Sequence, residues 1–185
     1  MPAFEFFFLK NLKYSFINKF NIYSLKKLPK FKKLVLSFKI KTPNIKLIAV
    51  HLLALEFISE KKSSLLTTSK KQNLMLKIKK GNPIGCKIFL SKKKLFTFLK
   101  KFSLNILPLN TLFNFIKIKL NKNCFSFVIG SPVLFSELEK FFNIFTNILK
   151  LNVVIVLNTN YKEEIVFILK SFLILSPKIA NVTQW

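Results

Sequence analysis

Apolar residues recur at intervals of three and four in four stretches of the chain, which are residues 4–22, 45–61, 92–106 and 162–173. This spacing gathers apolar side chains on one face of a helix, so each stretch is predicted to be helical. Pro108 stands shortly after the third stretch, where a proline commonly follows the end of a helix.

A different period appears in residues 34–40, where apolar and more polar positions alternate. Alternation places every second side chain on the same face of a strand. The predicted inner face carries Leu34, Leu36, Phe38 and Ile40.

Two more alternating segments flank the Gly-Asn-Pro turn in the sequence KIKKGNPIGCKIFL, residues 77–90. Residues 74–80 place apolar side chains on one face and lysines on the other. After the turn, one face of the predicted strand carries Cys86, Ile88 and Leu90, and the opposite face carries Lys87 and Phe89. We therefore predict a hairpin with one lysine-bearing face.

Three further stretches favour strands, which are residues 112–119, 124–129 and 151–158. The last is a continuous β-branched run and is predicted to be a central strand. Ser136 is predicted to cap a short helix, with Glu137 and Glu139 in its first turn. The mixture predicts an α+β sandwich with one twisted sheet, helices on one face and a lysine-lined opposite face.

The net charge of the chain indicates the kind of partner that it binds. The chain carries 32 lysines, no arginine and seven acidic residues, all glutamates, for a net charge of +25. Such a one-sided charge indicates a polyanionic partner, most often nucleic acid or an acidic membrane surface. Residues with AT-rich codons dominate, as 23 phenylalanines against three glycines illustrate, which favours an AT-rich genome such as that of an organelle.

The sequence argues against an enzyme, a cofactor and a metal site. His51 is the single histidine and lies within an apolar helical stretch, where packing explains it better than catalysis. Cys86 and Cys124 lie far apart without further ligands at metal spacing, so both are predicted to be reduced core residues. Three glycines are too few for a glycine-rich phosphate loop.

Membrane insertion is not expected. The most apolar segments, residues 47–58, 102–116 and 165–175, are too short or are interrupted by polar residues. The first sixteen residues lack the layout of a signal peptide or of an arginine- and serine-rich transit peptide. If the protein works in an organelle, synthesis inside that organelle is expected.

At KIKKGNPIGCKIFL the sequence resembles the signature of the universal large-subunit ribosomal protein five, a 5S-rRNA-associated family of the central protuberance. Nine positions match: Lys77, Ile78, Gly81, Pro83, Ile84, Gly85, Cys86, Lys87 and Leu90. Other segments follow the order of the family, so that the resemblance covers Ser24 to Leu173.

The resemblance implies a mainly antiparallel sheet with helices packed on one face, a two-layer sandwich of RRM-like type. It divides the chain into a helical extension at residues 1–23, the family domain at 24–175 and a tail at 176–185. It implies rRNA and neighbouring ribosomal proteins as partners. In the family these partners extend to 5S rRNA and to P-site tRNA, the latter through the hairpin from Lys77 to Gly85. A mitochondrial ribosome is the expected location, ahead of a plastid one.

The candidate RNA-binding residues join the exposed lysine clusters to the positions that the family implies. They are Lys26, Lys27, Lys30, Lys32, Lys33, Lys62, Lys70, Lys71, Lys77, Lys79, Lys80, Asn82, Lys87, Phe89, Lys92, Lys93 and Lys94. Lysines that neutralise several phosphates give strong, salt-sensitive binding that is independent of sequence.

The chain departs from the family pattern at Ser37, near Lys62, at Phe89 and Ser91 and at residues 112–115, and the resemblance implies that several of these positions face RNA. Phe89 offers a platform on which a base can stack, or it packs against a protein neighbour. Two other functions stay open from the sequence alone: a small basic membrane-associated subunit of an organellar complex, and a free organellar nucleic-acid-binding protein.

Overall fold

The computed structural model describes residues 3–22, 24, 27–40, 44–67, 81–103, 119–121, 123–159 and 161–173. Its helices and strands follow one another in this order: α1 (Ala3–Phe20), β1 (Phe31–Lys39), α2 (Ile45–Ser59), β2 (Ser64–Thr67), β3 (Pro83–Leu90), α3 (Lys92–Lys101), β4 (Lys119–Leu120), β5 (Cys124–Ile129), the 3-10 turn η4 (Pro132–Leu134), α4 (Ser136–Glu139), α5 (Phe142–Phe145), β6 (Leu151–Leu157) and α6 (Lys162–Leu173).

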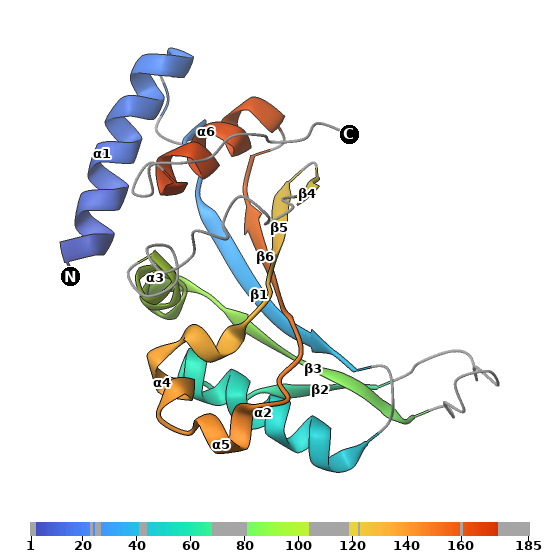
Figure 1. The fold of residues 1–185 in the computed structure, drawn as a ribbon. Coiled ribbons are helices and arrows are strands. Elements are labelled where there is room, and N and C mark those ends of the chain that lie inside the picture. The colour runs from blue at the N-terminus through green and yellow to red at the C-terminus, as the bar shows by residue number, and fades with distance from the viewer. Residues whose placement is uncertain are drawn as a thin grey trace.

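The strands form one six-stranded sheet in the order β2-β3-β1-β6-β5-β4. Every strand pair in the described part of the chain is antiparallel. Helices cover one face of this twisted sheet, as Figure 1 shows, so the predicted α+β sandwich is confirmed. The predicted central strand is also confirmed, because β6 lies between β1 and β5.

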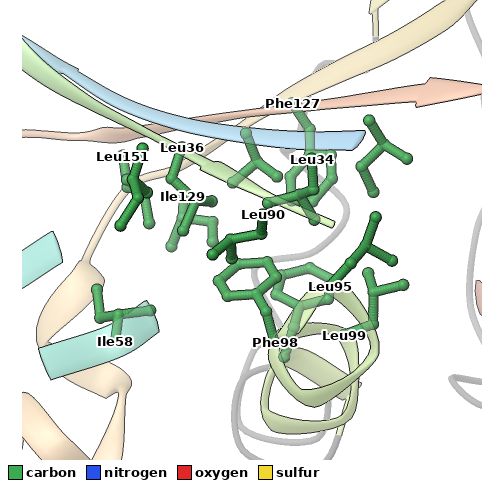
Figure 2. Close-up of a cluster of buried hydrophobic side chains, with 14 of the residues drawn as sticks. Leu34, Leu36, Ile58, Leu90, Leu95, Phe98, Leu99, Phe127, Ile129 and Leu151 are labelled. Carbon is green, nitrogen blue, oxygen red and sulfur yellow. The ribbon is translucent and has the colours of Figure 1, made fainter. Parts of the chain in front are cut away.

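The alternation of side chains along each strand determines which of them are buried in the core. The predicted inner residues Leu34, Leu36 and Phe38 of β1 are all buried, as is Ile40 directly after the strand. Cys86, Ile88 and Leu90 are buried on β3, and alternate residues of β5 and β6 join them. Figure 2 shows Leu34, Leu36 and Leu90 of this set on the side of the sheet that faces Leu95, Phe98 and Leu99 of α3.

The two cysteines differ in how deeply they are buried. Cys86 is fully buried, and desolvation raises the pKa of its thiol to about 12. Cys124 is half-buried, and both cysteines are free thiols. Of the two predicted core cysteines, only Cys86 is a core residue.

Helix α2 has well-defined ends. The Asn44 side chain accepts hydrogen bonds from the backbone N–H groups of Lys46 at 3.0 Å and Leu47 at 3.5 Å, which is a typical N-cap. Glu60 closes the helix in the left-handed conformation with φ of 53°, and its N–H donates to the Glu56 carbonyl oxygen.

Two predictions about local structure need correction. Ser136 is the first residue of α4 and not its N-cap, because the buried ring of Phe135 occupies the capping position without a side-chain hydrogen bond. The first strand begins at Phe31, three residues before the predicted start, because the Phe31 ring packs edge-on against Phe96 of α3 at 5.9 Å.

The N-terminal helix α1 lies beside α6 in Figure 1. Phe16 and Phe20 of α1 contact Phe167 of α6, with ring centroids 5.6 Å and 5.7 Å apart. The predicted strand at 74–80, most of that at 112–119, residues 104–106 and the tail at 176–185 lie outside the described residues.

His51 ties the middle of α2 to the segment that leads into β6. Its Nδ1 lies 2.6 Å from the Leu47 carbonyl oxygen and therefore carries a proton, while its Nε2 accepts the Leu149 N–H at 3.0 Å. The ring also meets Phe38 edge-on at 4.8 Å. The side chain is fully buried, so the prediction of a packed histidine is confirmed.

Candidate nucleic-acid interface

On the face of the sheet opposite the helices, side chains of paired residues form short rows that run across neighbouring strands. In one row Ser37 of β1 pairs with Lys87 of β3 and with Asn152 of β6. In the next row Val35 pairs with Phe89 and with Val154. These side chains share a face because directly paired residues of antiparallel strands point the same way.

Phe89 lies between two lysines on this face. The Lys33 Nζ lies 5.6 Å from the centroid of the Phe89 ring, and the Lys87 Nζ lies 5.3 Å from it. Both distances fall within the range of cation–π attraction. Phe89 is nevertheless 42% exposed, so part of its ring remains accessible to a partner.

Two side chains donate hydrogen bonds to the backbone of β3 near this ring. Lys61, which follows α2, donates from Nζ to the Phe89 carbonyl oxygen at 2.7 Å. Ser64 of β2 donates from Oγ to the Lys87 carbonyl oxygen at 3.0 Å. Lys61 thus brings a third ammonium group close to Phe89, and the candidate residues from the sequence did not include it. Its only sequence signal is its position next to Lys62.

We call Lys33, Lys61, Lys87 and Phe89 the Phe89 platform. It combines an exposed aromatic ring with three positive charges on rigid β1 and β3 and on the adjoining end of α2. The ring suits stacking with an unpaired base, and the ammonium groups suit the adjacent phosphates.

The remainder of the open face is less basic than the sequence predicts. Its middle is neutral, with Val35, Ser37, Val154 and Ser126 at the centre of the rows. Lysines stand nearer its margins, at Lys33, Lys39, Lys87 and Lys119. Among the described residues a lysine-lined face is therefore an overstatement, because their charge on this face is confined to positions at strand ends and on β3.

The other candidate residues are distributed over several surfaces. Lys27, Lys30, Lys32, Lys62, Lys92, Lys93 and Lys94 are exposed, and Asn82 is half-buried beside the turn. Lys94 does not join the platform, because its Nζ donates to the Glu60 carbonyl oxygen at the end of α2 at 2.8 Å. Lys32 lies at an irregularity in the pairing of β1 with β6, between Phe31 and Lys33.

Six of the candidate RNA-binding residues lie outside the described part of the chain. They are Lys26, Lys70, Lys71, Lys77, Lys79 and Lys80. The structure does describe the second half of the predicted hairpin, from Gly81 onwards. Gly81 has φ of +86°, a conformation that favours glycine and that forms the turn into β3.

Two other classes of site receive no support from the described ranges. No group of three or more histidine, cysteine or acidic side chains is arranged there to hold a metal ion. In the same ranges, none of the helices combines the length and apolar character that crossing a bilayer requires.

The chain is similar to several curated large ribosomal subunit proteins, although no protein-family model matches it. It is 30% identical over 160 residues to uL5m of Reclinomonas americana, covering 84% of this chain and 87% of that protein. It is 29% identical over 178 residues to uL5c of Euglena gracilis, covering 92% and 96%, respectively. A bacterial relative, uL5 of Ehrlichia ruminantium, is 32% identical over 106 residues, or 57% of this chain and 60% of the relative.

These relatives are mitochondrial, chloroplast and bacterial forms of one protein, and the first two support a place in an organellar ribosome. They are ribosomal proteins and not enzymes, as the sequence predicts for this chain. Because the similarity to the Reclinomonas protein spans most of both chains, this chain belongs to the uL5 family of large ribosomal subunit proteins.

Proposed function

We propose that the protein is a structural constituent of the large subunit of a mitochondrial ribosome and binds rRNA through the open face of its sheet. The observation that carries this proposal is the exposed Phe89 ring between the ammonium groups of Lys33 and Lys87. The net charge of +25 supports it, because a chain with so few acids needs a polyanion to offset its self-repulsion.

The platform reads RNA by shape and stacking. Double-stranded RNA is recognised mostly through phosphates and 2′-hydroxyls, whereas unpaired bases stack on aromatic side chains. Phe89 takes one splayed base, and Lys33 and Lys87 hold the phosphates on either side of it. Val35 and Val154 extend the face beneath the ribose and add no charge or donor of their own.

The place we propose within the subunit is the central protuberance, next to 5S rRNA or whatever replaces it there. The hairpin from Lys77 to Gly85 then approaches the P-site tRNA. Its described half supports this role through rigidity, because Gly81 makes a sharp turn and β3 is bonded on both sides, to β1 and to β2. Lys77, Lys79 and Lys80 supply its positive charge.

The proposed location is the mitochondrion. Its support is the uL5m relative of Reclinomonas and the strong bias of the composition towards residues with AT-rich codons. The similarity to the chloroplast relative of Euglena makes the plastid the alternative, so the test includes both organelles.

Sedimentation of organelle lysates on sucrose gradients tests the proposal. An epitope-tagged full chain is expected to co-migrate with the large subunit in the mitochondrial gradient, and a cryo-EM map of that peak is expected to place it against rRNA in the central protuberance. Co-migration with plastid ribosomes overturns the location. A chain that stays in the membrane pellet after alkaline carbonate extraction, without rRNA, overturns the function in favour of a membrane-associated subunit.

A further inference from the structure

A second surface of the molecule is apolar, and it lies in the helix layer. On α2 the residues Ile45, Ala49, Leu53 and Phe57 follow one another at four-residue intervals, and all four are exposed. Ile45 is 78% exposed and Leu53 is 41% exposed. Side chains at this spacing form one stripe along a helix. The side of a surface helix that faces away from the core usually carries polar residues. Helix α2 is therefore apolar on its outer side as well as on its buried side.

The stripe continues onto the segment that contains α4 and α5. The Phe57 ring stacks on Phe141, with centroids 5.5 Å apart and an interplanar angle of 13°, and it meets Phe145 edge-on at 6.0 Å. Figure 1 shows α4 and α5 alongside α2. We call the exposed apolar residues of the two segments the α2–α5 surface; they are Ile45, Ala49, Leu53, Phe57, Phe141, Phe142, Ile144 and Leu149.

The two segments are held together rigidly. The Leu149 N–H donates to His51 Nε2 at 3.0 Å, and His51 is buried within α2. Phe145 is fully buried beneath the same segment. The surface is thus preformed, which lowers the entropic cost of binding a partner.

Charge identifies the kind of partner. Among the exposed residues of 45–57 and 141–149, Lys46 alone carries a charge, in a chain with 32 lysines. The exposed polar residues between them are neutral, at Asn143, Thr146 and Asn147, whereas Lys46, Lys140 and Lys150 stand at the margins with Glu139. The Phe57 and Phe141 rings stack on each other, and the exposed residues around the phenylalanines supply no cluster of lysines to hold phosphates, so rRNA is a poor occupant. A second copy would bring another charge of +25 against the first.

We infer that the α2–α5 surface docks the apolar face of a helix from another protein of the large subunit, with acidic side chains opposite the marginal lysines. The stripe from Ile45 to Phe57 spans about 18 Å, which is more than three turns of a partner helix. Apolar contacts supply the affinity, and the lysines orient the partner. This inference rests on the proposed place of the chain in a ribosome.

Photo-crosslinking in reconstituted large subunits tests the inference. The full recombinant chain carries p-benzoylphenylalanine in place of Leu53 and is assembled into large subunits, which are purified on a gradient and irradiated. The expected product joins position 53 to one ribosomal protein, within a peptide that contains apolar and acidic residues. Crosslinks to rRNA, to lipid or to a second copy overturn the inference, as does the absence of a protein crosslink in subunits that contain the chain.

A variant gives an independent readout. In the Ile45→Gln and Leu53→Gln double variant, both changes keep a good helix former at an exposed site, so folding is expected to persist. The amount of the crosslinked protein in purified large subunits is expected to fall about tenfold, while the amount of this chain stays constant. An unchanged amount of that protein overturns the inference.

The matched control is Tyr14→Gln on the exposed side of α1, which is expected to leave the subunit composition unchanged. A chain that is missing from the large-subunit peak overturns the proposed function itself. A chain that is present there without a protein crosslink at position 53 overturns only the inference.

Discussion

Gly85 on β3 lies so close to the carbonyl oxygen of Phe38 on β1 that a Cβ atom at position 85 would overlap that oxygen. The register places Gly85 opposite Lys39 and the adjacent Cys86 opposite Phe38. Because the obstructing atom belongs to the backbone of a central strand, it cannot rotate away as a side chain can. The second glycine of the Gly-Asn-Pro-Ile-Gly sequence is therefore a packing requirement of the sheet.

The first prediction concerns this glycine. Gly85→Ala is expected to destabilise the protein by about 1–3 kcal/mol, because β3 must move away from β1 to admit the methyl group. Urea unfolding of the purified full chain measures the change. Gly130→Ala is the matched control, because nothing lies within 4 Å of a Cβ atom at that position. Its effect is expected to stay within about 0.5 kcal/mol. Equal effects of the two substitutions would show that the close approach does not limit packing.

The secondary structure followed closely from the periodicity of the sequence. The predicted helix at 162–173 has the same bounds as α6, and the inward residues of β1 and β3 are those that the alternation selects. These elements were predictable because one face of each is buried, which imposes a strict period on the apolar positions. The start of β1 was not predictable, because Phe31 packs against the core past an irregularity in the pairing of β1 with β6 that breaks the alternation.

The candidate site was only partly predictable. Alternation placed Lys87 and Phe89 on one face, as the structure has them. The approach of Lys33 depends on the register of β1 against β3, which no local pattern specifies. Lys61 reaches Phe89 across 28 residues of sequence, so only the folded chain identifies it as a member of the platform.

The second prediction concerns His51 and pH. Burial lowers the pKa of His51 below its ordinary value of 6.5, although the hydrogen bond to Leu47 opposes that shift. The unfolded chain therefore takes up this proton at a higher pH than the folded chain does. His51 is expected to reduce the free energy of unfolding as the pH falls below about 6.5, until the folded imidazole also becomes protonated.

Comparison with His51→Gln isolates this effect. At pH 7 the variant is expected to be less stable by about 1–3 kcal/mol, because the Leu149 N–H, in a partly buried hydrogen bond, loses or weakens its acceptor. The difference between the two proteins is expected to shrink at pH 5, as urea unfolding at the two pH values would show. A difference that does not change with pH would mean that His51 does not stay neutral in the fold.

The third prediction concerns an ion-pair cluster that joins three helical segments. The Lys101 Nζ of α3 lies 2.7 Å from Glu60 Oε1 and 2.8 Å from Glu137 Oε1. Burial on its own raises the pKa of the Glu137 carboxyl, but the hydrogen bond and charge of Lys101 outweigh it and hold the pKa below 4.5. Glu137→Gln is expected to cost about 1 kcal/mol at pH 7.

The pH dependence of that cost follows from the direction of the shift. The stabilisation by Glu137 is present above pH 4.5 and is lost as the pH falls through the lower pKa of the folded state. Thermal unfolding of wild type and variant at pH 7 and at pH 3 measures it, with the exposed neighbour Glu139→Gln as the control. A Glu137→Gln variant that behaves like Glu139→Gln at neutral pH would contradict a stabilising cluster.

The last prediction separates the two uses of Phe89 that the sequence leaves open, stacking with a base or packing against a protein. Phe89→Ala in the full chain is expected to weaken binding to rRNA purified from the large subunit by about 5- to 150-fold, the effect of one stacked base. The slope of the affinity against salt concentration is expected to stay the same, because no charge is removed. Lys33→Gln combined with Lys87→Gln is expected to reduce that slope by about 1.4, since each phosphate contact on single-stranded RNA contributes about 0.7.

Fluorescence anisotropy across a salt series measures both quantities, and Lys140→Gln, on the helix layer away from the platform, is the control that is expected to change neither. Loss of slope in the double lysine variant with unchanged affinity in Phe89→Ala would mean that the lysines meet phosphates while the ring serves a protein neighbour. Full retention of affinity and slope in every platform variant would move the RNA contact to another surface of the chain. The two kinds of substitution therefore measure separately what the lysine charges and the Phe89 ring contribute to RNA binding.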